Sequence, residues 1–102
     1  MTHPVYITYP AIWQGIPLEV RYAPQWSPFS FDGHKLVHLE VQSQGRVPLP
    51  ITGTGYRSHF MHVLPEDDIT DPVAFVLAWL DEEAKAESWK ATVQASRQGT
   101  LF

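Results

Sequence analysis

Apolar and polar residues alternate along three stretches in the first half of the chain. The clearest is residues 16–22, where every second residue is apolar and Glu19 and Arg21 lie between. Residues 5–9 and 35–43 follow the same period of two. This period is typical of a strand with one buried and one solvated face. We therefore predict three strands of an antiparallel sheet.

The connections between these stretches suit the same sheet. Gln14-Gly15 predicts a hairpin turn between the first two strands, and residues 23–34 read as a loop rich in proline and aromatic residues. Residues 47–51 contain two prolines, which removes two backbone donors and leaves only an edge strand or an extended cover. A further short strand is expected over residues 56–63.

The apolar period changes in the last third of the chain. Asp71 is placed to cap a helix with Pro72 at its first position, and apolar residues then recur at steps of three and four to about residue 86. A second helical stretch is expected over residues 89–97. The prediction is an α+β fold: an antiparallel sheet of three to five strands packed against one or two C-terminal helices, in a single domain spanning residues 1–97.

Composition narrows the possible functions of this domain. The 102 residues include no cysteine, which excludes disulfides, cysteine-ligated metals and a thiol nucleophile. The net charge is −4, and eight acidic residues against one lysine lie within residues 66–87. An acidic chain is a poor match for broad binding to nucleic-acid phosphates. No apolar run is long enough to span a membrane, so a cytoplasmic protein is expected.

The densest polar cluster lies at residues 53–59, where two glycines precede Tyr56, Arg57 and His59. Glycines allow a ligand to approach the backbone, a guanidinium can bind phosphate or carboxylate, and an imidazole can transfer a proton. With Arg46, these side chains are candidates for contact with a ligand or nucleic acid. A glycine turn between two strands explains the same residues without any site.

Other residue types add two expectations. Trp13 and Trp26 fall in a predicted turn and loop, and they are candidates for an exposed surface that recognises a partner. The five histidines have spacings that do not suit a metal site on strands, so we expect no metal and no cofactor. No catalytic residue is assigned.

The chain ends in Gln98-Gly99-Thr100-Leu101-Phe102. This segment resembles the short peptide by which bacterial proteins dock on the sliding clamp of DNA replication. Gln98, Leu101 and Phe102 match that pattern, whereas Gly99 stands where an aliphatic residue is more usual. The resemblance implies an exposed peptide at residues 98–102 and the clamp as a partner.

Three functions are compatible with these patterns. The first is a non-enzymatic interaction protein of bacterial or phage origin, since the chain is similar in general character to small accessory proteins of mobile elements. The second is a small nucleic-acid-processing enzyme, of the toxin-like ribonuclease kind, that uses residues 53–59. The third is an acidic inhibitor of a nucleic-acid-binding protein, acting through Asp67, Asp68, Asp81, Glu82 and Glu83. The first is favoured, and the oligomeric state is left open.

Overall fold

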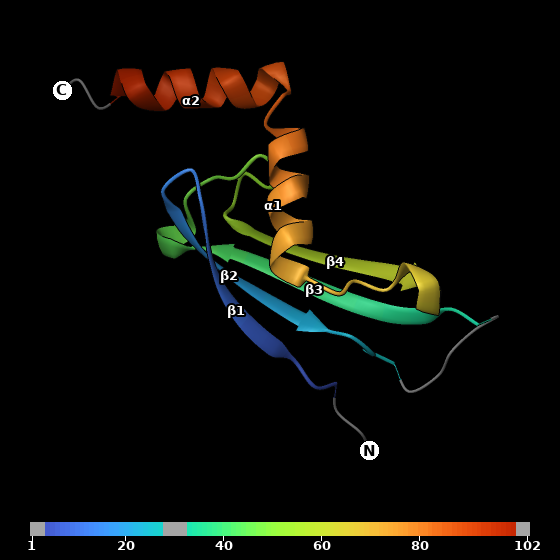
Figure 1. Ribbon diagram of the computed structural model, residues 1–102. Helices are drawn as coiled ribbons and strands as arrows, with labels where there is room; N and C mark the ends of the chain where they lie inside the picture. The colour runs from blue at the N-terminus through green and yellow to red at the C-terminus, as the bar shows by residue number, and fades with distance from the viewer. Residues whose placement is uncertain (1–3, 28–32, 100–102) are drawn as a thin grey trace.

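The computed structural model describes residues 4–27 and 33–99. Within them, four antiparallel strands form one sheet and two helices follow it, which confirms the predicted α+β class (Figure 1). The strands follow chain order across the sheet: β1 (Ile7–Trp13), β2 (Ile16–Ala23), β3 (Lys35–Ser43) and β4 (Tyr56–Val63). The helices are α1 (Pro72–Glu83) and α2 (Glu87–Gly99), and two short 3-10 turns are η1 (Gln44–Arg46) and η2 (Pro65–Asp67).

The turn between β1 and β2 sets the hydrogen-bonding register of the sheet. Gln14 and Gly15 both have positive φ, 48° and 80°, as the tightest hairpin turns require. Such a turn makes Trp13 and Ile16 a hydrogen-bonded pair, so every second residue of β1 bonds to β2. Pro10 then faces the open edge of the sheet, where its missing N–H costs no ladder bond.

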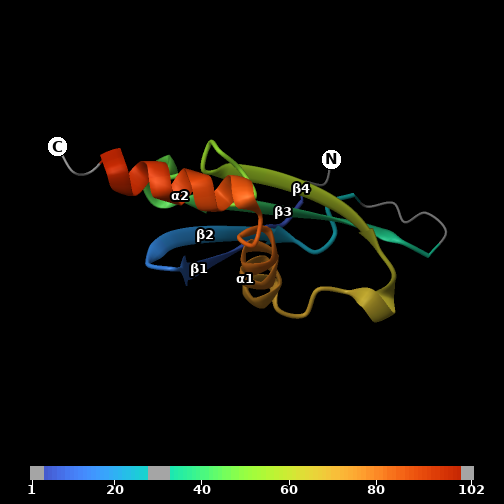
Figure 2. The ribbon, with the colours of Figure 1, turned by 90° about the horizontal axis from the view of Figure 1, so that it is seen from above.

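One face of the sheet holds the hydrophobic core. Val20 of β2 and Val37, Leu39 and Val41 of β3 are fully buried on this face. α1 packs over them and contributes fully buried side chains of its own (Figure 2). The predicted apolar side of β3 is therefore confirmed as the core side.

α1 begins as predicted. The Asp71 carboxylate accepts a hydrogen bond from the backbone N–H of Ala74 at 3.0 Å, and Pro72 occupies the first turn. α1 ends at Glu83, three residues earlier than the pattern predicts, and α2 runs at a steep angle to it and away from the sheet (Figure 1). The ring of Trp89 lies 5.8 Å from that of Trp13 and ties the start of α2 to the body.

The segment between η1 and β4 is an extended cover and adds no strand to the sheet. Leu49 and Ile51 from this segment are buried in the core, and its only ladder is an isolated bridge between Leu49 and Thr52. Phe29 and Phe31 of the predicted aromatic loop lie outside the described residues. No helix among the described residues is long and apolar enough to cross a membrane.

Candidate functional site

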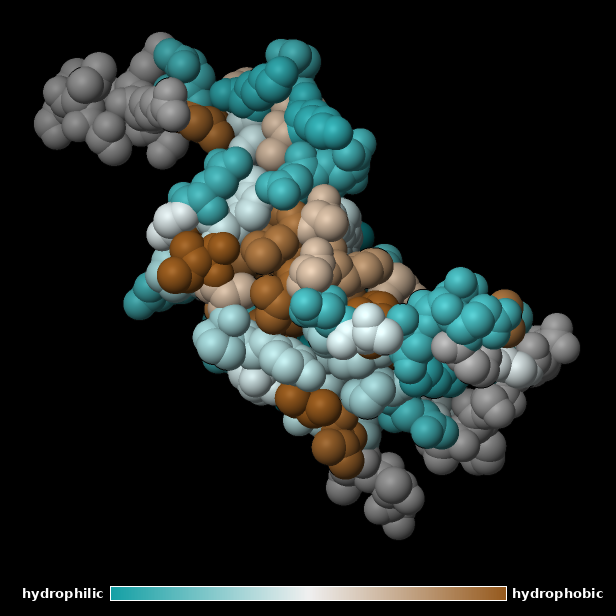
Figure 3. Space-filling view, in the orientation of Figure 1, coloured by the Kyte–Doolittle hydropathy of each residue, from teal (hydrophilic) through white to brown (hydrophobic). Residues whose placement is uncertain are grey.

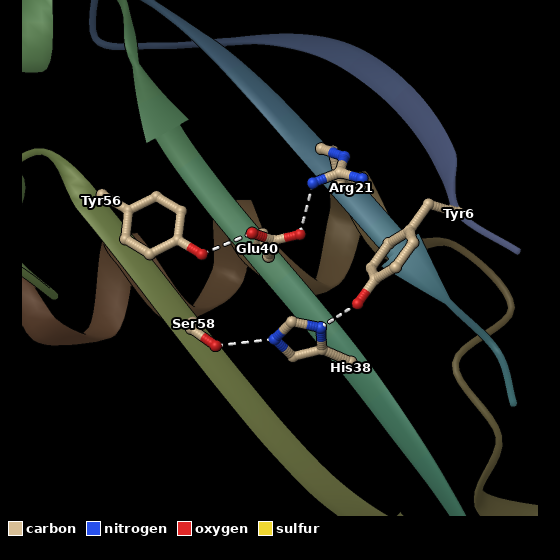
Figure 4. A network of polar contacts seen from close by, with 6 residues as sticks. All are labelled: Tyr6, Arg21, His38, Glu40, Tyr56 and Ser58. Carbon is tan, nitrogen blue, oxygen red and sulfur yellow. Dashed lines mark hydrogen bonds and ion pairs between the residues drawn. The ribbon is translucent and has the colours of Figure 1, made fainter. Parts of the chain in front are cut away.

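The face of the sheet opposite α1, here called the outer face, carries a connected set of polar side chains. Strand alternation sends every second residue to this side, and the observed register brings residues of β2, β3 and β4 together. Figure 4 shows the set at close range. Its members come from the segment before β1 and from β2, β3 and β4: Tyr6, Arg21, His38, Glu40, Tyr56 and Ser58.

His38 is the centre of one half of this network. Its Nδ1 lies 2.5 Å from the hydroxyl of Tyr6, and its Nε2 lies 2.6 Å from the hydroxyl of Ser58. The ring stacks on Phe60 with centroids 4.1 Å apart, and only 6% of the residue is exposed. Burial lowers the pKa of His38, with Arg21 adding to this and Glu40 opposing it. A neutral imidazole can accept from one hydroxyl and donate to the other.

Glu40 is the centre of the other half. Its carboxylate accepts from the Arg21 guanidinium at 2.6 Å and from the Tyr56 hydroxyl through its second oxygen. The hydrogen bond to Glu40, with burial adding to it, raises the pKa of Tyr56. The Arg21 guanidinium also lies 4.4 Å from the ring centroid of Tyr6, which joins the two halves.

This geometry is suited to rigidity more than to catalysis. The distance between Ser58 and His38 is that of a nucleophile and its base, but the second imidazole nitrogen faces the phenol of Tyr6. In the Ser-His-Asp triad a carboxylate occupies that place and orients and charge-balances the imidazole. The nearby carboxylate of Glu40 is instead engaged by Arg21 and Tyr56.

The structure separates the candidate ligand residues of the sequence. Tyr56 points to the outer face, whereas Arg57 and His59 lie on the other side of β4, beside Trp79 of α1 at 5.6 Å and 4.9 Å. Arg46 lies over the ring of Tyr56, at 5.6 Å. The structure therefore does not gather these four residues on one face, because neighbours on a strand point to opposite faces. Burial and the Arg57 charge lower the pKa of His59.

The two candidate tryptophans also have different environments. Trp13 is only 3% exposed, and its indole N–H donates to Asp81 at 2.9 Å, so its predicted place on an exposed surface is wrong. The α1 helix covers it, which a hairpin turn alone could not reveal. Trp26 is 38% exposed, and its ring meets the edge of Phe60 on the outer face at 5.1 Å.

The acidic stretch is largely engaged within the domain. Asp68 accepts from Lys35 at 2.7 Å and from Tyr22 at 3.1 Å; burial tends to raise its pKa, but these hydrogen bonds outweigh burial and lower it. The Asp81 carboxylate accepts a hydrogen bond from the Trp13 indole. Glu82 of α1 forms an ion pair with Lys85 in the turn after the helix. These partnerships leave a smaller acidic surface than residues 66–87 suggest.

The remaining candidates concern metals and the C-terminal peptide. No group of three or more metal-ligating side chains gathers among the described residues. Gln98 and Gly99 form the last turn of α2, and Leu101 and Phe102 lie outside the described residues. The clamp-binding peptide therefore stays a prediction.

The outer-face network was not among the candidate sites of the sequence. Tyr6, His38 and Ser58 are far apart along the chain, and only the strand register brings them into contact. The one signal was the alternation of β3, which places His38 and Glu40 on the side away from the core. Their partners could not be named before the pairing of β3 with β4 was known.

Fold and surface together define a small α+β domain with helices on one side of its sheet and an ordered polar and aromatic surface on the other. Residues 6–89 match the family model described as the KlcB third domain. The match spans most of the chain, and the chain belongs to this family. No curated protein and no solved structure matches the chain significantly.

Proposed function

We propose that this domain is a non-enzymatic protein-interaction domain whose partner binds the outer face around Trp26 and Phe60. The observation that carries this proposal is the outer-face network, which fixes a solvent-facing surface of the sheet that no helix of the described residues covers. The link between the KlcB family and plasmids supports an accessory role for a bacterial mobile element.

Exposed aromatic rings supply the anchors that such a surface needs. Trp26 and Phe60 are 38% and 48% exposed, and they contact each other edge to face. Phe60 also stacks on His38, whose imidazole is held at both nitrogens. Large aromatic side chains that are already ordered lose little entropy on binding and commonly dominate interface energies.

The charge of this face favours a protein partner over nucleic acid. The Arg21 guanidinium is paired with the Glu40 carboxylate at 2.6 Å, and Glu19 adds an exposed acid on the same side of β2. Binding to phosphates depends on unpaired lysine and arginine that replace counterions. Among the described residues of the outer face, the unpaired Arg46 beside Tyr56 is offset by Glu19, so no surplus of positive charge remains.

The test compares two aromatic substitutions on opposite sides of the domain. Trp26→Ala removes an outer-face anchor, and Phe75→Ala on α1 removes a ring of nearly equal exposure, 37%, from the helix side. We expect tagged wild type and Phe75→Ala to capture the same protein from lysate of a plasmid-bearing host, and Trp26→Ala to lose it. Equal capture by all three chains would place the binding surface elsewhere and contradict the proposal.

A second candidate role rests on the direction of α2. This helix leads away from the sheet, and Gly99 lies at its far end (Figure 1). A helix that leads away from the sheet supports docking on the sliding clamp, because a partner can reach its end without meeting the sheet. Calorimetry with a purified bacterial clamp should show binding by the full chain and none by a chain ending at Arg97. Equal heats from the two chains would remove this role and leave the outer-face proposal untouched.

A further inference from the structure

The two edges of the sheet are unlike. On β1, Pro10 stands at an outward position and interrupts the row of edge donors, a common way to block pairing with another strand. β4 contains no proline. The bond from Ser43 N–H to Gly55 C=O, 2.9 Å, sets the register in which Ser58, Phe60 and His62 direct their main-chain groups outward.

The outward edge of β4 is open from Ser58 to His62. The carbonyl of Tyr56 is engaged by the Thr52 hydroxyl at 2.9 Å, which closes the beginning of the strand. No main-chain hydrogen bond joins Ser58, Phe60 or His62 to another described residue on this side. An unblocked edge of this kind pairs readily with a further strand.

Charge is distributed unevenly along β4. Arg57 lies near its beginning with Arg46 close by, whereas Glu66 and Asp67 follow its end in η2. All four residues are exposed, and none forms an ion pair with another described residue. Figure 3 shows hydrophilic surface at the place of η2, beside the apolar surface around α1. The edge is therefore basic at one end and acidic at the other.

We propose that β4 pairs antiparallel with β4 of a second copy about a two-fold axis, with Phe60 opposite Phe60 of that copy. In this register Ser58 lies opposite His62 of the second copy, and the outward main-chain groups of both strands are paired. Arg57 lies opposite Val63 of the second copy, next to its η2 carboxylates. Each basic end thus meets an acidic end.

The distribution of charge along the edge of β4 favours a second copy of this chain as the partner. The antiparallel two-fold pairing brings unlike charges together twice, whereas a parallel arrangement would set basic ends side by side. The pairing also sets the Phe60 rings of the two copies side by side on the outer face, where they stay available to the outer-face partner. The resulting dimer has one continuous sheet with α1 of both copies on the same face. This proposal goes beyond the proposed function because it uses the edge of β4 and not the outer face.

A charge exchange tests the proposal with surface substitutions. Arg57→Glu alone, or Glu66→Lys with Asp67→Lys alone, sets like charges together at both ends of the pairing. We expect each variant to dissociate about ten- to thirtyfold more readily than wild type. Mixed in equal amounts, the two variants restore unlike charges at both ends, and we expect a heterodimer as stable as the wild-type dimer. Sedimentation equilibrium separates the dimer from the 11.6 kDa chain.

A backbone variant provides an independent arm. His62→Pro removes an outward N–H that no strand of the same chain uses, and we expect a monomer; His62→Ala keeps the amide and should dimerise. Thermal unfolding of each variant confirms that it is folded. The proposal would be overturned by a wild-type chain that is monomeric at millimolar concentration. It would also be overturned by a dimer whose stability changes neither with the charge exchange nor with His62→Pro. Trp26→Ala should lose the outer-face partner yet remain dimeric, so the two proposals fail separately.

Discussion

The two faces of the sheet are built from the same strands but held by different forces. On β3, Val37, Leu39 and Val41 are fully buried under α1, whereas His38 and Glu40 between them are held by hydrogen bonds and an ion pair. Apolar burial stabilises in proportion to area and tolerates small shifts in position. Hydrogen bonds act over short distances and favour one geometry. The helix side therefore supplies most of the stability, and the outer face supplies a defined surface.

The largest expected effect comes from the helix side. Leu39→Ala removes a fully buried side chain from the centre of the core and leaves a cavity under α1. We expect a loss of about 3 kcal/mol in the free energy of unfolding, measured by urea denaturation. Retention of wild-type stability would show that the core can collapse around the deletion, and the contrast between the faces would then disappear.

A smaller effect is expected from the ion pair of the outer face. Arg21 and Glu40 meet at 2.6 Å, but the arginine is partly exposed and solvent screens the pair. A double-mutant cycle with Arg21→Ala and Glu40→Ala should give a coupling energy of about 0.5–1 kcal/mol in denaturation experiments. A coupling as large as the loss expected for Leu39→Ala would mean that the outer face contributes as much to stability as the core.

The smallest effect concerns the pH dependence of folding. Burial holds the pKa of His38 below its ordinary value of 6.5, so the unfolded chain binds a proton before the folded chain does as the pH falls. The free energy of unfolding should therefore decrease as the pH is lowered from above 6.5 through the folded pKa. His59 acts in the same direction.

Replacement of the imidazole isolates its share of this effect. In His38→Gln the decrease in the free energy of unfolding below pH 6.5 should be shallower than in wild type. Ser58→Ala keeps the imidazole, so its decrease should be steeper than that of His38→Gln. Chemical denaturation at a series of pH values provides the comparison. Identical slopes for wild type and His38→Gln would show that His38 takes up its proton equally well in both states.

Local sequence signals predicted much of the fold. The bounds of β3, the Gln14-Gly15 turn and the Asp71 cap were all readable, because alternation, positive-φ turn residues and capping side chains act over a few residues. The end of α1 was placed three residues too late. The apolar period continues past Glu83, and only the packing of the following turn shows where the helix stops.

The site was predicted far less well, since it depends on contacts between distant residues. Tyr56 and Arg57 were grouped because they are adjacent in sequence, yet strand geometry sends them to opposite sides. Trp13 was assigned to an exposed surface because it lies in a predicted turn. Its hydrogen-bond partner Asp81 lies on a helix much later in the chain, so the local sequence did not show that Trp13 is covered. The pairing of His38 with Tyr6 and Ser58 likewise follows from register alone.

The slender attachment of α2 has a dynamic consequence. Trp89 against Trp13 is its one ring contact with the sheet among the described residues, and most other described positions of the helix are exposed. Segments with few buried contacts open locally at a lower free energy than the packed core, so we expect α2 to open before the sheet does. At about 1.5 Å per residue, its 13 residues form an arm of roughly 20 Å. Local opening at Trp89 would therefore change the direction of this arm while the sheet stays folded.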